Sequence, residues 1–388
     1  MGIKGLGDIK KNNSPLSKCQ MPLSVLKGKK VAIDVHNVLY ANLSVVQKMA
    51  VSKTDVTTTE IDSRESLVQL FRMMLTQALK WLDHDIVPIF VFEGRAPIEK
   101  ADELEQRKEK REEKEAEIEE LKLAASSFDV FEKKNETLTR LRKLMASNIR
   151  PEGEDITFLF TVLSSLGLPC VQAKGEGEQL CSMLALEGVV AAVYCNDYDC
   201  LAYGTNILIH RFVYGARDEQ GAPIVAVEIT NLPQLLSDLQ MNQATFLELC
   251  IMLGCDYNTN IPNYGPVKSL KLIREYGTID NIGKTGLDIS YLKHETCRRM
   301  FKKVSSIDLI EIGRLELVNP FTNVEATLEI RELLDSVKLG DMATAFARSM
   351  QNITPSKKIK LSLIVKDEFN GKEEVIVKPK LKLRILGD

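Results

Sequence analysis

Acidic residues stand at the ends of three short apolar segments in this 388-residue chain. One acid after a strand usually caps a turn. In an open parallel sheet, however, the carboxyl ends of the strands share one edge, and ligands bind in the crevice beyond it. The sequence therefore predicts a group of carboxylates at that edge. They are Asp34 within segment 30–35, Glu93 after 87–92, and Asp197 and Asp199 after 189–194.

Three further acids belong to the same prediction. Glu176 and Glu178 precede an apolar helical pattern, and Asp256 follows a second one. A capping turn is the structural alternative for the first pair, but Gly175 and Gly177 would let the backbone approach a ligand closely. Carboxylate oxygens in this number suit magnesium better than zinc. Seven acids at one site would repel one another strongly unless a divalent cation neutralised them.

The elements that position these acids indicate an α/β fold. Segments 30–35, 87–92 and 189–194 are short, apolar and rich in β-branched residues, as expected of buried strands. Segment 66–81 carries apolar residues at three-four spacing and predicts a helix between the first two strands. Strands that alternate with helices imply a parallel sheet.

Three other regions differ from this pattern. Residues 100–145 favour a helix but have little apolar face, which predicts an exposed helical excursion from the sheet. Residues 246–276 predict two helices joined by a hairpin at 258–266, and the alternation around Asn370-Gly371 predicts a β-hairpin. We divide the chain into six regions: 1–99, 100–150 (the helical excursion), 151–230, 231–300 (the helix pair), 301–355 and 356–388 (a basic tail).

The composition indicates a globular chain, and its charges are unevenly distributed along the sequence. It is 44% hydrophobic and 27% charged, and no apolar run reaches the roughly 18 to 20 residues of a membrane helix. We therefore expect an intracellular protein with no membrane partner. The net charge of −3 is unfavourable for a polyanionic partner. Residues 99–120 hold eleven acids and six bases, whereas 356–388 hold nine bases and five acids, so modest basic surface remains.

Cysteines and histidines give no zinc signature. The eight cysteines lack the two-residue gap typical of zinc sites, and the four histidines have no Cys or His partner at ligand spacing. We interpret the cysteines as reduced, mostly buried thiols and assign no chemistry to the histidines.

Six motifs in order along residues 1 to about 280 give the chain a family resemblance. Each is weak alone, but together they are specific. It resembles the flap endonuclease branch of the 5′ nuclease superfamily, which implies a PIN-like parallel or mixed sheet with helices on both faces, a helical arch and a helix-two-turn-helix module. The motifs are Met1-Gly-Ile-Lys-Gly-Leu, Val31-Ala-Ile-Asp, Val91-Phe-Glu-Gly, Glu176-Gly-Glu, Asp197-Tyr-Asp-Cys-Leu and Leu253-Gly-Cys-Asp-Tyr.

The resemblance also implies roles for individual residues. Two Mg²⁺ ions, for which Mn²⁺ could substitute, would lie roughly 4 Å apart on the scissile phosphate, so no side-chain nucleophile is needed. Lys100 and Arg107 would be catalytic cations on the arch, and K⁺ could bind at the helix-two-turn-helix. The implied metal ligands are Asp34, Glu93, Glu176, Glu178, Asp197, Asp199 and Asp256. The implied DNA contacts are Gly2, Tyr40 (a stacking aromatic, or else a core tyrosine), Arg111, Gly265 and Lys268.

The implied function is a monomeric 5′ flap endonuclease acting on branched or flapped DNA in the nucleus, or in a viral replication site if the source is viral. Alternatives are a 5′ to 3′ exonuclease or bubble-cutting nuclease of the same superfamily, and a DNA-binding scaffold without activity. A dinucleotide-binding fold is excluded because no glycine-rich loop follows the first strand. Glu93 stands where the family has Asp, the hairpin reads Ile261-Pro-Asn-Tyr-Gly-Pro, and the family's sliding-clamp motif is absent, so a clamp partner is left open.

Overall fold

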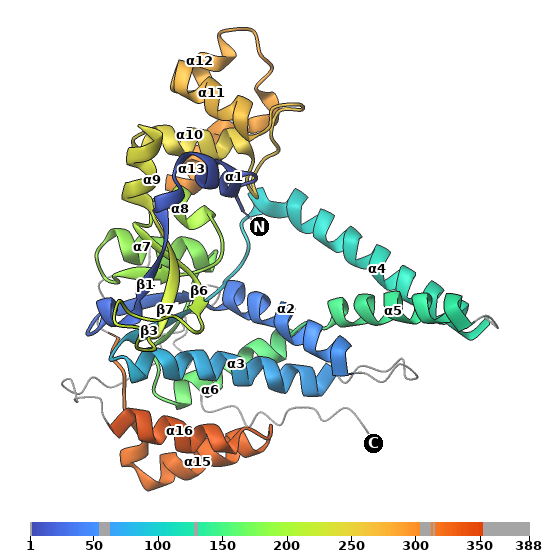
Figure 1. Ribbon diagram of the computed structural model, residues 1–388, viewed down its shortest axis with the longest axis vertical. Helices are drawn as coiled ribbons and strands as arrows, with labels where there is room; N and C mark the ends of the chain where they lie inside the picture. The colour runs from blue at the N-terminus through green and yellow to red at the C-terminus, as the bar shows by residue number, and fades with distance from the viewer. Residues whose placement is uncertain (1, 54–62, 128–130, 303–311, 313–314, 352–388) are drawn as a thin grey trace, which may run out of the picture.

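The computed structural model describes residues 2–53, 63–127, 131–302, 312 and 315–351. A mixed sheet of seven strands lies between two layers of helices (Figure 1). Its strand order is β1-β7-β6-β5-β2-β3-β4. The strands are β1 (Lys18–Pro22), β2 (Lys30–Asp34), β3 (Val87–Phe92), β4 (Cys170–Gln172), β5 (Ala192–Tyr194), β6 (Ile207–Val213) and β7 (Ala226–Asn231).

The order of the parallel strands places a crevice beside β2. Strands β2, β3 and β4 follow one another toward one edge, whereas β5 and β6 continue from β2 toward the other. Strands β7 and β1 extend the sheet in antiparallel pairing. The direction of winding thus reverses between β2 and β5, the type of position at which open α/β sheets bind ligands.

Alternation along the strands fills two cores, because successive side chains point to opposite faces of the sheet. Ala32 and Val91 face one helical layer, whereas Ile33 and Phe92 face the other. The expected helices on both faces are confirmed. The first layer contains α1 (Leu6–Asn13), α7 (Gly177–Leu186), α8 (Asp199–Tyr203), α9 (Leu232–Leu239), α10 (Gln243–Leu253), α11 (Pro266–Tyr276), α12 (Ile279–Gly283) and α13 (His294–Lys302). The second contains α2 (Val35–Lys53), α3 (Ser63–Asp83), α6 (Gly153–Ser165), α15 (Val324–Asp335) and α16 (Gly340–Gln351).

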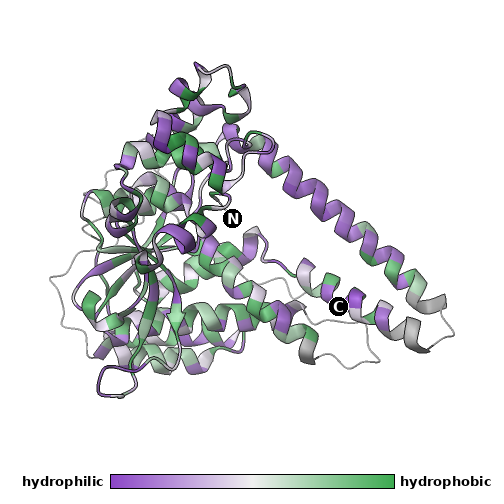
Figure 2. Ribbon diagram, turned by 45° about the horizontal axis from the view of Figure 1, so that its top comes forward, coloured by the Kyte–Doolittle hydropathy of each residue, from purple (hydrophilic) through white to green (hydrophobic). Residues whose placement is uncertain are grey.

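The charged segment leaves the body as a helical arch. After the short turn η3 (Ile98–Lys100), α4 (Ala101–Ser127) runs outward and α5 (Phe131–Asn148) returns beside it (Figure 1). Helix α4 is hydrophilic along most of its length (Figure 2), and ion pairs such as Arg107–Glu103 at i,i+4 spacing support it. Ile118 and Leu141 are buried on the two helices. The helical excursion predicted for 100–145 is confirmed as two helices.

The predicted helix pair around 246–276 is also confirmed, as α10 and α11. The side chain of Asn258 fixes the hairpin between them. Its amide oxygen accepts from the Cys255 backbone N–H at 2.8 Å, and its amide nitrogen donates to the Leu292 carbonyl at 2.8 Å. Asn263 is left-handed with φ 65°, a conformation that asparagine tolerates better than most residues. Short 3₁₀ turns complete the described part: η1 (Pro15–Ser17), η2 (Leu23–Leu26), η4 (Ser290–Leu292) and η5 (Pro320–Thr322).

One predicted strand is shorter than expected. Within 189–194, only the residues of β5 pair with β2, because the residues before them form the turn that ends helix α7. Gly188 is left-handed (φ 70°), and Val189 donates its backbone N–H to the Leu184 carbonyl at 2.9 Å. The hairpin predicted in 356–388 lies outside the described residues. Among the described helices, none combines the length and apolar character needed to span a membrane.

Candidate metal centre

Four carboxylates converge where the sheet reverses its winding. Asp34 ends β2, Asp197 follows β5, Asp199 begins α8, and Glu178 lies in the first turn of α7. Oxygen atoms of Glu178, Asp197 and Asp199 lie within 4.8 Å of one another. We call these four residues the inner acids. Parallel strands bring them together from positions up to 165 residues apart.

The inner acids are buried, and no cation among the described residues forms an ion pair with them, although the charge of Lys100 partly offsets the upward pKa shifts of Asp197 and Asp199. Burial raises the pKa of Asp34 to about 7 and raises that of Glu178 well above its usual range, where the charge of Asp199 adds to the effect. Burial likewise raises the pKa values of Asp197 and Asp199. Neither carboxylate oxygen of Asp199, a residue 1% exposed, has a hydrogen-bond partner among the described residues. Buried oxygens in this state suit a hard divalent cation, which would supply the missing partner.

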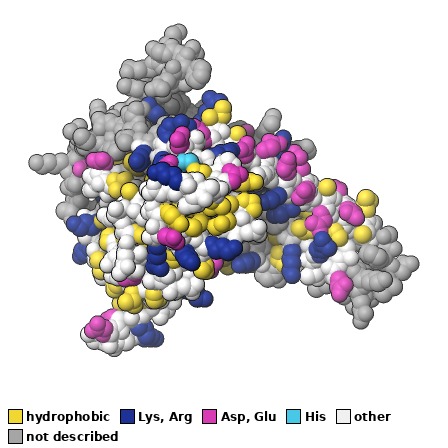
Figure 3. Space-filling model, turned by 90° about the horizontal axis from the view of Figure 1, so that it is seen from above, with side chains coloured by type: hydrophobic (Ala, Val, Ile, Leu, Met, Phe, Trp, Pro, Cys, Tyr) yellow, Lys and Arg dark blue, Asp and Glu magenta, His cyan; other side chains and the backbone are white. Residues whose placement is uncertain are grey.

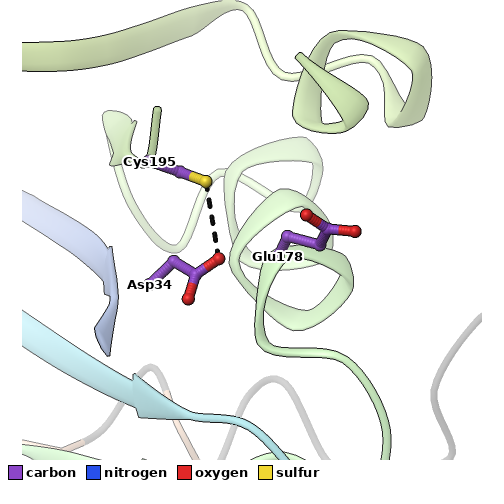
Figure 4. Close-up of side chains that lie close together, drawn as sticks. All are labelled: Asp34, Glu178 and Cys195. Carbon is purple, nitrogen blue, oxygen red and sulfur yellow. Dashed lines mark hydrogen bonds between the residues drawn. The ribbon is translucent and has the colours of Figure 1, made fainter. Parts of the chain in front are cut away.

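A thiol shares this site, which the sequence analysis did not foresee. Cys195 immediately follows β5, and its Sγ donates to Asp34 Oδ2 at 3.4 Å (Figure 4). Its sulfur and oxygens of Asp34 and Glu178 all lie within 4.8 Å of one another. The interpretation of the cysteines as buried reduced thiols holds for most of them, but it gave Cys195 no place in the chemistry. Its position two residues before Asp197, at the end of the same strand, was the available signal.

The other three predicted acids surround a lysine instead. Lys100, in η3, is only 7% exposed, and its Nζ lies 2.5 Å from Glu176 Oε1 and 2.9 Å from Asp256 Oδ2. Tyr257 donates its hydroxyl to the second oxygen of Glu176. Glu93 is partly buried; burial raises the pKa of its carboxyl group, and the nearby charge of Lys100 acts in the opposite direction. We call Glu93, Glu176 and Asp256 the outer acids.

Lys100, in η3, and Arg107, on α4, both reach the outer acids from the base of the arch. Arg107 Nη2 lies 3.4 Å from Asp256 Oδ2, and the same guanidinium pairs with Glu103. Burial alone lowers the pKa of the Lys100 ammonium, but the surrounding carboxylates outweigh burial and the net shift is upward. Arg111, one turn further along α4, is exposed. Ion pairs therefore hold the base of the arch against the outer acids.

The remaining predicted residues lie in three different places. Gly2 has φ 78°, and a Cβ there would come within 1.7 Å of Asp197 Oδ1, so its backbone lies directly against the inner acids. Tyr40 on α2 is 44% exposed, which excludes a core role. Gly265 precedes α11, and Lys268 donates to the Asn263 carbonyl at 3.1 Å, so both belong to the α10–α11 hairpin.

Gly94 is a site residue that the sequence analysis quoted in a motif without giving it a role. A Cβ at this position would lie 2.0 Å from the Ala173 carbonyl oxygen, and the Gly94 N–H donates to the Gly175 carbonyl at 2.7 Å. The chain after β3 therefore passes close to the segment that carries Glu176. Glycine directly after Glu93 was the signal for this close approach.

Fold and site together define a class: a mixed α/β protein with buried carboxylates at its switch point and a charged helical arch above them. Two family models match the chain, the XPG N-terminal domain over residues 1–114 and the XPG I-region over residues 167–256. Flap endonuclease 1 of Lodderomyces elongisporus is 33% identical over 284 residues, which cover 73% of this chain and 68% of that protein. Flap endonuclease 1 of Brugia malayi is 30% identical over 335 residues, 85% of this chain and 82% of that protein. The chain belongs to the flap endonuclease family.

Solved structures share the fold at lower identity. Flap endonuclease-1 from Methanococcus jannaschii matches with a TM-score of 0.54 and 22% identity, covering 86% of this chain and 96% of that one. The catalytic core of Rad2 in complex with DNA substrate matches with a TM-score of 0.53 and 18% identity, covering 89% and 98%. The PIN-like α/β architecture expected from the sequence is thereby confirmed.

Proposed function

We propose that this chain is a structure-specific 5′ flap endonuclease that hydrolyses DNA phosphodiester bonds in replication and repair. The observation that carries the proposal is the set of inner acids, which lie buried at the switch point of a family-typical fold and include two Asp199 oxygens with no hydrogen-bond partner among the described residues. Such a site is costly to the fold without a cation. A function that needs divalent metal explains why the chain retains it.

Two Mg²⁺ ions fit this carboxylate set best. Glu178, Asp197 and Asp199 offer oxygens within 4.8 Å of one another. The outer acids Glu93, Glu176 and Asp256, which lie around Lys100, would supply further oxygen ligands. Metal bound there would activate a water molecule and stabilise the leaving oxygen, so no protein nucleophile is required. Mn²⁺ shares the preference for oxygen ligands and could substitute.

The cationic residues of the arch would hold the DNA phosphate. Lys100 now pairs with Glu176 and Asp256, so it can transfer to a phosphate oxygen once those carboxylates are neutralised. Arg107 lies beside it and pairs with the same Asp256. Both side chains would then stabilise negative charge that develops during hydrolysis.

DNA contacts are proposed at four places near this site. The exposed ring of Tyr40 would stack on an unpaired base, Gly2 would place backbone at the scissile end, and Arg111 would contact phosphate on the arch. The α10–α11 hairpin, with Gly265 and Lys268, would bind the uncut duplex, where a K⁺ site is possible. On the face seen in Figure 3, basic side chains are dispersed among acidic and apolar ones.

Cleavage assays on three substrates test the proposal. A labelled 5′ flap, a nicked duplex and a blunt duplex would be compared with and without Mg²⁺. The proposal expects metal-dependent cleavage with the flap strongly preferred. Preference for the nicked or blunt end would favour a 5′ exonuclease, and metal-independent DNA binding without cleavage would favour a scaffold. A monomer at a nuclear or other replication site is part of the proposal, and a sliding-clamp partner is left open. The relatives named above, from a yeast and a nematode, give a viral replication site no support.

A further inference from the structure

Cys195 gives the inner site a ligand that magnesium does not use. Figure 4 shows Asp34 from β2, Glu178 from α7 and Cys195 beyond β5 gathered together. The 3.4 Å separation of Cys195 Sγ and Asp34 Oδ2 matches the roughly 3.5 Å expected between a sulfur and an oxygen bound tetrahedrally to one zinc ion. Cys195 and Asp34 are thus spaced as ligands of one ion, and an oxygen of Glu178 lies within 4.8 Å of both.

A second observation indicates that this place attracts a cation. Glu178 belongs both to this group and to the group with Asp197 and Asp199. Both oxygens of Asp199 are buried and lack hydrogen-bond partners among the described residues. These buried oxygens lack the partners that buried polar atoms need, which favours a cation that can also satisfy the sulfur.

We propose that Asp34, Glu178 and Cys195 bind a thiophilic divalent cation, Zn²⁺ or Cd²⁺, and that this binding inhibits the enzyme. The inference deepens the proposed function, on which its inhibitory consequence rests. A soft or borderline cation prefers thiolate, whereas Mg²⁺ prefers oxygen ligands. The thiophilic ion would occupy two carboxylates that the proposed nuclease needs for Mg²⁺.

The binding step exchanges a proton for a metal–sulfur bond. The Cys195 thiol donates its S–H to Asp34 when no cation is bound. On binding, the S–H bond breaks, a metal–sulfur bond forms and the proton passes to the solvent; nothing is oxidised or reduced. The hydrogen bond to Asp34 is lost in the same step, which frees that carboxylate to become a ligand.

Titration of the metal-free, full-length protein with Cd²⁺ tests the site without relying on activity. The readout is the ultraviolet charge-transfer band of a cadmium–thiolate bond. Cys195→Ser keeps a hydroxyl donor for Asp34 but removes the sulfur, so it should weaken Cd²⁺ binding at least about tenfold, since even indirect partners of a metal ligand are worth this much. Cys255→Ser is the matched control, because Cys255 is also buried but lies beside Cys297, with 4.0 Å between the two sulfurs.

A band that survives in Cys195→Ser and disappears in Cys255→Ser would overturn the proposal and assign the metal to the other thiol pair. Glu178→Gln provides a second check if Cys195→Ser fails to fold. It leaves every thiol in place, and the proposal expects it to weaken the band as well; an unchanged titration would contradict the site.

Inhibition separates this inference from the proposed function. In Mg²⁺, the Zn²⁺ concentration that halves flap cleavage should be at least about tenfold higher for Cys195→Ser, each protein being compared with its own uninhibited rate. Equal sensitivity would reject the inhibitory site while flap cleavage stands. If the parent cuts no flap in Mg²⁺, the proposed function fails, whereas the cadmium band still decides whether the thiol site exists.

Discussion

The inner and outer acids are both groups of closely placed carboxylates, but they are neutralised in different ways. The inner acids Asp34, Glu178, Asp197 and Asp199 are buried with raised pKa values and no cationic partner at ion-pair distance among the described residues. The outer acids have Lys100, with Arg107 next to it. The inner acids are therefore neutralised by protons or by metal, whereas the outer acids carry a protein cation that they can exchange for metal. This difference predicts opposite responses to mutation in the two halves.

Removing an inner acid should have the largest effect on activity. Asp199→Asn is expected to reduce flap cleavage by roughly 10³-fold or more, because a metal ligand that supports the transition state is lost. The same substitution should stabilise the metal-free chain near neutral pH, since it removes a carboxyl group whose pKa is raised by burial and by the charge of Asp197, so that its ionisation opposes folding. Single-turnover cleavage and thermal unfolding in a chelator measure the two effects, and DNA binding should stay within a few-fold. A destabilised metal-free variant would contradict our description of the inner acids.

Removing the cation of the outer acids should slow cleavage less and change stability in the opposite direction. Lys100→Ala is expected to lower the single-turnover rate by about 10²-fold. It leaves Glu176 and Asp256 without their closest cationic partner, so the metal-free chain should lose stability. Added Mg²⁺ should restore part of that stability. If the variant changes only DNA affinity, Lys100 is a positioning contact and takes no part in the chemistry.

Glu93 tests whether an outer acid serves as a metal ligand. Glu93→Ala should lose most cleavage, whereas Glu93→Asp, one methylene shorter, should retain it. Because Mg²⁺ demands near-octahedral geometry, the longer Glu93 should make the parent more active in Mn²⁺ than in Mg²⁺. Rates in the two metals provide the measurement. Full Mg²⁺ activity in Glu93→Ala would reduce the site to six acids.

Stability against pH provides a finer test of the inner acids. The pKa of Asp34 is raised from 3.8 to about 7 in the folded state, so the folded chain holds this proton more tightly than the unfolded chain. The resulting stability is fully present below about pH 4 and is lost as the pH rises through about 7. In chelator, the unfolding free energy of the parent should fall between about pH 5 and pH 8 by on the order of 2 kcal/mol more than that of Asp34→Asn. Parallel pH profiles would show that Asp34 is already ionised without metal.

Many residues of the site could be predicted from the sequence, but their division into inner and outer acids could not. Strands β2 and β3 were readable because each is a short apolar run, and Asp34 and Glu93 follow from chain position alone. That Lys100 would neutralise Glu176 and Asp256 depends on how the base of the arch folds back over the sheet. No local pattern encodes a contact between residues 76 and 156 positions apart.

Two further features lacked a distinctive local signal. Strand β1 is mostly exposed and forms only because β7 pairs with it, so its residues carry no alternating apolar pattern. Cys195 resembles any buried thiol at the end of a strand until Asp34 is placed beside it. In both cases, the role of the residues depends on a contact with a distant part of the chain, and their residue types alone do not reveal it.

The smallest expected effect concerns Tyr257, which orients an outer acid without contacting the inner ones. Its hydroxyl donates to Glu176, and Lys100 holds the other oxygen of the same carboxylate. Tyr257→Phe removes one of these two restraints while keeping the ring that packs on Phe301. A hydrogen bond to a charged group contributes about 1.5 to 3 kcal/mol, but Lys100 still fixes Glu176, so we expect cleavage to slow by only about 3- to 10-fold. The loss should appear in the rate at saturating DNA and leave DNA affinity unchanged. Combined with Lys100→Ala, the substitution should cost more than the product of the two separate effects, because Glu176 then loses both restraints. Strict additivity would show that the two residues act on the outer acids independently.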